Sequence, residues 1–244
     1  GPAAIAAFAY GLPEVGLEPV NLVTGPGNIY VAAAKRALRG TIGIDSEAGT
    51  TEILVIADDS ADARFIAYDL VSQAEHDEAA ASVLVTASEA LAAAVERELA
   101  TVAAQTAHAQ RVATALAGQQ SAIVLVDDLD AAIHFANFYA TEHLEIHTAN
   151  DQGILSRITN AGAVFVGKYS PVSLGDYMAG SNHVLPTGQQ AKFGAGLGVH
   201  SFLRAQQVID YDADALGAIA AQVRDFAESE NLPAHGQAIT ARFE

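Results

Sequence analysis

Four short segments of the sequence hold side chains that could bind a metal ion or transfer protons. They contain Gln73 and His76, Glu142 and His143, Asp176 and His183, and His235. Imidazoles, carboxylates and a side-chain amide are the groups that a divalent metal site and a proton-transfer site both need. Each segment lies near a glycine or near the end of an expected element, which packing alone does not explain. The residue types therefore predict an enzyme.

The spacing within the first two segments favours a shared site but leaves an alternative open. Gln73 and His76 are three residues apart in an expected helix, so they share one face and can approach one ion. The same spacing fits a solvated helix end. Glu142 beside His143, at the entrance to an expected strand, suits an acid/base pair with pKa values near neutrality. An exposed turn between a helix and a strand is the alternative.

Three further segments each allow both a functional and a purely structural interpretation when taken alone. The segment from Asp176 to His183 (DYMAGSNH) has a glycine that allows close backbone approach, yet it also reads as a plain loop. His235 follows Pro233 and fits a surface histidine as well as a ligand. The turn Gly25–Asn28 could hold a phosphate at a helix start, or Asn28 could simply cap the helix. The other histidines are read as structural or surface groups: His108, His134, His147 and His200.

Composition excludes several classes of function. The chain has 244 residues, 51% of them hydrophobic and 17% charged, which predicts one or two globular domains. Its net charge of −17 repels phosphate backbones and anionic lipids, so we expect neither nucleic acid nor membrane as a partner. The chain has no cysteine, so a metal must be held by nitrogen and oxygen atoms, and no thiolate can act as nucleophile. The sequence shows no membrane span and no signal peptide, which predicts a cytoplasmic protein.

Strand-like and helix-like segments alternate along most of the chain. Apolar strand patterns occur at 20–24, 52–57, 82–86, 122–126, 144–147 and 163–166. Helical patterns occur at 1–11, 28–38, 62–76, 88–116, 129–140 and 152–160. Such alternation predicts an α/β fold with a parallel sheet and helices on both faces. After Pro171 the chain becomes glycine-rich and loop-like, and a helical tail follows from about residue 213 to 243.

Six strings of residues, in order along the chain, resemble one known family. They are GPGNIYVAAAKR, GIDSEAGTTEILVIAD, LVSQAEHD, ATEHLEIHT, NAGAVFVGKYSPVSLGDYMAGSNHVLPT and ENLPAHGQAITAR. Together they span essentially the whole chain and resemble histidinol dehydrogenase. Chance could supply one such string but not six in sequence.

The resemblance implies a zinc-dependent, NAD-linked homodimer that oxidises L-histidinol to L-histidine through histidinal, the last step of histidine biosynthesis. Two hydrides leave in succession. The implied metal ligands are Gln73, His76, Asp176 and His235. The implied substrate contacts are Thr51, Gln73, His76, His143, Asp176, His183, Glu230 and His235, of which Glu230 and His235 come across the dimer interface.

The resemblance also assigns the proton transfers. His143 would be the base that removes the alcohol proton, and Glu142 would activate water against the aldehyde. Asn28 matches a nucleotide contact. The lack of cysteine agrees with this assignment, because oxidation of an aldehyde without a thiol adduct needs a water activated by a carboxylate.

The resemblance implies three regions within an incomplete pair of Rossmann-like domains. Residues 1–50 would be a remnant of the nucleotide-binding domain, residues 51–197 the zinc and catalytic domain, and residues 198–244 a helical tail used in dimerisation. The family's chain is longer, and its additional part precedes Gly1. Ala3 stands where the family usually has a nucleotide-contacting glutamine, and Thr51 where it commonly has serine. We therefore expect the metal part to be intact and the NAD part to be incomplete, with activity impaired.

Two other functions fit the same residues. A zinc-dependent hydrolase could use the histidines and acids with Glu142 activating a metal-bound water. A non-catalytic fragment could bind zinc and dimerise without turnover. NADH formation from histidinol separates the first from the dehydrogenase, and comparison with a longer chain separates the second.

Overall fold

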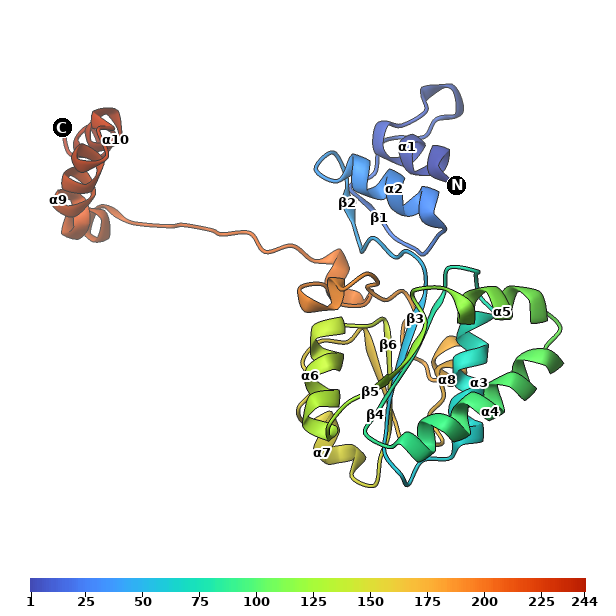
Figure 1. Cartoon of the computed structure of the whole chain (residues 1–244). Helices are drawn as coiled ribbons and strands as arrows, with labels where there is room; N and C mark the ends of the chain where they lie inside the picture. Colours follow the sequence, from blue (N-terminus) through green and yellow to red (C-terminus); the bar gives the residue numbers. More distant parts are fainter. The chain divides into compact units, whose positions relative to one another are not determined.

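The computed structural model describes residues 1–244 and divides into two compact units, 1–203 and 204–244. The first unit is built on a five-stranded parallel sheet in the order β5-β4-β3-β6-β7. Its strands are β3 (Glu52–Ala57), β4 (Ala81–Thr86), β5 (Ala122–Leu125), β6 (His143–His147) and β7 (Ala163–Val166). Helices cover both faces of this sheet (Figure 1). The prediction of a parallel α/β fold is confirmed.

Alternate residues of the central strands pack against opposite helical layers. Leu54 of β3 and Ile146 of β6 face helices α6 (Leu129–Tyr139) and α7 (Asp151–Leu155). Ile53 and Val55 of β3 face helices α3 (Ala63–Ala74) and α4 (Glu89–Gln105), together with Val172 of α8 (Val172–Tyr177). Apolar side chains cover both faces of β3 because parallel strands under two helical layers have no solvent-exposed side.

The strand order brings the beginnings of β3 and β6 together. From β3 the chain runs outward to β4 and β5, and then returns to the other side of β3 as β6 and β7. Ile53 pairs with His143 where the two strands begin, at what we call the amino edge of the sheet. Ala57 pairs with His147 where they end, at the carboxyl edge. Residues just before β3 and β6 therefore meet at the amino edge, and the loops after them meet at the carboxyl edge.

Residues 1–50 have a small core of their own. It consists of α1 (Pro2–Tyr10), a 3₁₀ turn (Pro13–Val15), α2 (Ile29–Leu38) and the parallel strands β1 (Leu22–Val23) and β2 (Gly43–Ile44). Lys35 of α2 is buried and pairs with Asp45 at 2.6 Å. Asp45 also accepts a hydrogen bond from the Gly25 amide, at 2.7 Å, so this pair ties α2 to the turn that follows β1.

The second unit consists of two helices that pack on each other, α9 (Ala213–Ser229) and α10 (Pro233–Thr240). Asn231, in the turn between them, has a left-handed backbone with φ of 58°. Two short 3₁₀ turns, Gln190–Lys192 and Val199–Phe202, precede this unit. None of the helices in the chain has the length and apolar character needed to cross a membrane. The predicted domain boundaries at residues 50 and 197 stay predictions.

Several predicted helix boundaries are wrong. The single helix expected at 88–116 is two helices, α4 and α5 (Ala109–Ala117). The break occurs because the backbone at Thr106 is extended. The Thr106 hydroxyl there accepts a hydrogen bond from the His108 amide at 3.4 Å. Helix α7 ends at Leu155 rather than near residue 160. Helix α8 lies in the stretch that was expected to be loop after Pro171.

Candidate active site

Glu142 and Thr51 lie side by side at the amino edge of the sheet. Thr51 immediately precedes β3, and Glu142 immediately precedes β6. Oε2 of Glu142 accepts a hydrogen bond from the Thr51 hydroxyl at 2.6 Å and another from the Glu52 amide at 3.0 Å. Residues that are 91 positions apart are thus held together by the pairing of two adjacent strands.

Burial is the main influence on the Glu142 carboxyl, which is only 7% exposed. It raises the pKa of Glu142 to about 7, and the nearby carboxylates of Glu52 and Asp176 act in the same direction. The hydrogen bonds from Thr51 and Glu52 oppose this rise because they stabilise the charged form. The carboxyl therefore changes charge in the range in which a general base works at neutral pH.

His143 is buried at the start of β6, and its hydrogen bond to a backbone carbonyl determines its tautomer. Its Nδ1 lies 2.9 Å from the carbonyl oxygen of Glu52. A carbonyl only accepts, so Nδ1 carries the hydrogen and Nε2 carries the lone pair. Burial, with the neighbouring His183 acting in the same direction, lowers the pKa of His143 to about 3. The ring is therefore neutral at neutral pH and presents Nε2 as a proton acceptor.

Asp176 and His183 approach the His143 ring from the segment after β7. Nε2 of His183 lies 2.5 Å from Oδ1 of Asp176 and 3.2 Å from Nε2 of His143. The two imidazole rings stack with centroids 5.0 Å apart. Helix α8 can carry Asp176 this close because Gly175 has no side chain: a Cβ there would meet the Phe165 ring at 2.7 Å.

Three of the four predicted metal ligands line one cavity of about 350 Å³. These are Gln73, His76 and Asp176, from the end of α3 and from α8. Gln73 is buried and its amide nitrogen donates to the Thr51 hydroxyl, which turns the amide oxygen away from Thr51. An amide oxygen, an imidazole and a carboxylate fit a borderline cation such as zinc. Their assignment as ligands stays a prediction.

The remaining predicted residues belong to other elements of the chain. Glu230 and His235 are exposed and belong to the second unit, at the end of α9 and in α10. Asn28 caps helix α2, with its side-chain oxygen accepting from the Tyr30 and Val31 amides at 3.1 and 3.2 Å. The capping alternative is thus present in the structure. The NAD contact at Asn28 and the contribution of Glu230 and His235 across an interface stay predictions.

The sequence did not predict the role of Glu52 in the site, and it left open the setting of His147 on the same strand. Glu52 positions His143 through its backbone carbonyl, a role that no residue type signals. His147, read as a structural or surface group, is buried on the same face of β6 as His143 and Glu145. The alternation of polar residues at 143, 145 and 147 in an otherwise apolar strand was the signal that could have drawn attention to it.

The fold and this geometry define the chain as a parallel-sheet α/β protein with a buried carboxyl–imidazole pair at the amino edge of its sheet. Comparison with known proteins gives the family. The family model for histidinol dehydrogenase matches residues 1–243, and the chain belongs to this family.

Individual relatives agree with that assignment. Histidinol dehydrogenase from Leifsonia xyli subsp. xyli is 65% identical over the whole chain, which covers 56% of that protein. The protein of the same name from Corynebacterium glutamicum is 59% identical, with 55% of it covered. The crystal structure of histidinol dehydrogenase from Elizabethkingia anophelis matches with a TM-score of 0.88 and 34% identity, covering 98% of this chain and 55% of that one. The chain thus spans about half the length of the curated relatives it matches.

A more distant likeness concerns the fold alone. A propionaldehyde dehydrogenase from Clostridium phytofermentans matches with a TM-score of 0.50 and 13% identity, over 82% of this chain.

The family model and the curated relatives confirm the histidinol dehydrogenase family that the sequence predicted.

Proposed function

We propose that this chain provides the metal-binding and acid–base part of a zinc-dependent, NAD-linked enzyme that oxidises L-histidinol to L-histidine through histidinal. Family membership supports the proposal. The observation that carries it is the burial of Glu142 against His143, whose Nδ1 lies 3.5 Å from Oε2 of Glu142. A carboxyl with pKa near neutrality beside a neutral imidazole supplies two proton acceptors of different character at one place.

The residues present fit a zinc ion. Gln73, His76 and Asp176 would hold it, with His235 contributed across the interface of a homodimer. Zinc would orient the imidazole and amino nitrogens of the substrate. NAD would accept the two hydrides, and Asn28 is the one position in this chain for which the resemblance implies a contact with it.

His143 and Glu142 divide the proton transfers. Nε2 of His143 takes the proton of the alcohol during the first oxidation, because the Glu52 carbonyl fixes the hydrogen on Nδ1. Glu142 then takes a proton from the water that adds to the aldehyde carbon, and His143 accepts a proton again in the second oxidation. This chain supplies no cysteine for a thiol adduct, and the proposed nucleophile for the aldehyde is water. Thr51, His183 and Glu230 would contact the substrate.

The test is an assay for NADH formation from L-histidinol, carried out with this sequence in a protein of the relatives' full length and with this chain alone. We expect the full-length protein to form NADH, and we expect removal of metal by a chelator to abolish this activity. We expect His76→Asn to lower both bound zinc and activity. Zinc-dependent hydrolysis without NADH formation would contradict the proposal and favour the hydrolase alternative.

A further inference from the structure

A second cluster of ionisable side chains lies farther along strand β6. Asp69 of α3, Glu145 and His147 each offer one oxygen or nitrogen atom, and these atoms lie within 4.8 Å of one another. Glu145 and His147 share a face of β6 with His143 because alternate residues of a strand point to the same side. His143 and His147 are four residues apart, or about 13 Å along a strand, so this cluster is separate from the site at the amino edge.

The cluster contains buried polar atoms that lack hydrogen-bond partners. Glu145 is fully buried, and its Oε1 accepts from the Val172 amide at 2.9 Å, but its Oε2 has no hydrogen-bond partner. Both ring nitrogens of His147 also lack one, although its side chain is only 2% exposed. Nε2 of His147 faces Oε2 of Glu145 at 3.3 Å. Buried polar groups are normally paired, so the two unpaired ring nitrogens of His147, beside two carboxyl groups, indicate a ligand.

The charge of the cluster also favours a cation. No lysine or arginine forms an ion pair with Asp69 or Glu145. Burial, followed by the proximity of Glu145, raises the pKa of Asp69 to about 8, so a proton separates the two carboxyls at neutral pH. A divalent cation would neutralise both carboxylates in place of that proton, and His147 would bind as a neutral imidazole.

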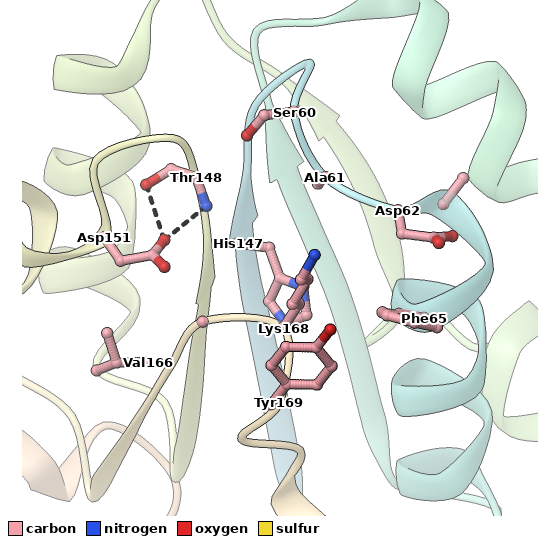
Figure 2. A pocket seen from close by; sticks show the side chains of 12 residues that line it. Ser60, Ala61, Asp62, Phe65, His147, Thr148, Asp151, Val166, Lys168 and Tyr169 are labelled. Carbon is pink, nitrogen blue, oxygen red and sulfur yellow. Dashed lines mark hydrogen bonds between the residues drawn. The ribbon is translucent and has the colours of Figure 1, made fainter.

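A cavity at the carboxyl edge of the sheet reaches one member of the cluster, His147. His147 lines this cavity of about 920 Å³ together with residues of the loops that follow β3, β6 and β7. Figure 2 shows the side chains of His147, Lys168 and Tyr169 among those that line this cavity. The chain reverses direction across the sheet between β3 and β6, and ligands of open α/β sheets commonly bind outside the carboxyl ends of strands at such a point.

We propose that Asp69, Glu145 and His147 form a second divalent-cation site, separate from the cavity lined by Gln73 and His76. Two carboxylates and one imidazole suit Mn²⁺ or Zn²⁺. The ion would join α3 to β6, and through Glu145 it would also fix the start of α8. The role is structural, and it does not depend on the proposed enzymatic function.

The test counts ions bound by the full-length protein carrying this sequence, after chelation and dialysis against Mn²⁺ or Zn²⁺ alone. We expect His147→Gln and Asp69→Asn each to bind one ion fewer per chain than the unaltered protein. His76→Asn should also bind one fewer, and the double variant His76→Asn/His147→Gln two fewer. His134→Gln, which changes an exposed histidine on α6, is the control and should bind the full number.

Thermal unfolding gives a second readout. Mn²⁺ should still raise the unfolding midpoint of His76→Asn, and this rise should be lost in the double variant His76→Asn/His147→Gln. Asp69→Asn keeps the proposal testable if His147→Gln does not fold, because an asparagine amide can donate to Glu145 as a protonated Asp69 would. The proposal is overturned if Asp69→Asn binds as many ions as the unaltered protein. Because His76→Asn reports on the other site, failure of the two proposals can be told apart.

Discussion

At the scale of single residues, the charge state of Glu142 depends on opposing influences. Burial raises its pKa, and the hydrogen bonds from Thr51 and the Glu52 amide lower it, with a balance at about 7. A general base works only when deprotonated, so the rate that depends on Glu142 should fall as the pH falls through that value. Replacing Thr51 can change the pKa of Glu142 without removing its carboxyl group.

Replacing Thr51 with valine should shift the acidic limb of the pH profile of kcat/KM to higher pH. The hydroxyl stabilises the carboxylate form of Glu142, so its loss raises the pKa of that group, by about one unit if the hydrogen bond contributes about 1.4 kcal/mol. The limb is measured by initial rates between pH 5 and 9. Thr51→Ser keeps the hydroxyl and should leave the limb in place. A limb unchanged in Thr51→Val would show that Glu142 does not control it.

The sequence predicted part of the site at this scale. The adjacent carboxyl and imidazole of Glu142 and His143 could be read directly, because they are neighbours in the chain. The tautomer of His143 could not, because it is set by a backbone carbonyl of a residue 91 positions away. The sequence left open whether His147 is a structural or a surface group, and the structure buries it.

At the scale of elements, close backbone packing holds Glu142 in position. Gly162 lies just before β7, where a Cβ would come within 2.5 Å of the Glu142 carbonyl oxygen. A backbone atom cannot move aside as the end of a flexible side chain can. A side chain at position 162 would therefore displace the start of β6, which holds Glu142 and His143 in place, although Gly162 has no assigned contact with substrate.

Gly162→Ala should lower kcat strongly and destabilise the fold by about 1–3 kcal/mol, because the added methyl group pushes the Glu142 backbone away. Steady-state kinetics and urea unfolding of the same sample measure the two effects. Gly198→Ala is the matched control, since a Cβ at Gly198 meets nothing within 4 Å. If Gly162→Ala behaved like the control, the close approach would have no role in positioning Glu142.

The buried pair of Lys35 and Asp45 should dominate the stability of residues 1–50. Lys35→Met leaves the Asp45 carboxylate buried without its partner and should cost about 3–5 kcal/mol of unfolding free energy. Arg36→Met, one position along the same helix, removes a pair whose arginine is 70% exposed and should cost at most about 1 kcal/mol. Denaturant unfolding compares the two variants, and equal costs would contradict the interpretation.

At the scale of the whole molecule, the four predicted metal ligands are divided between the two units of the chain. Gln73, His76 and Asp176 belong to the first unit, and His235 belongs to the second. The alternating strands and helices predicted the architecture of the first unit, because hydrophobic periodicity is a local signal. The break between α4 and α5 and helix α8 were not predicted. The Thr106 hydroxyl donates to Glu75, 31 positions away, and Gly175 of α8 packs against Phe165, and both contacts form only in the folded chain.

A mixture of two inactive variants tests whether His235 acts across a dimer interface. In a hybrid of His143→Asn and His235→Ala subunits, one site would regain both residues if His235 comes from the neighbouring subunit. Random exchange of equal amounts should then restore about a quarter of the activity, because half of the dimers are hybrids with one intact site each. The measurement is NADH formation after subunit exchange in full-length protein. No recovery would place His143 and His235 of each site in the same subunit.

The most direct test of the account is the amount of NADH formed per L-histidinol consumed by the Glu142→Gln variant in full-length protein. In the proposed mechanism, Glu142 takes a proton from the water that attacks the aldehyde, and His143 takes the proton of the alcohol. The unaltered enzyme should form about two NADH per substrate, as two successive hydride transfers require. Glu142→Gln should form about one and accumulate material at the aldehyde level, which a carbonyl-trapping reagent would capture. A variant that still forms two NADH per substrate at an undiminished rate would contradict the account.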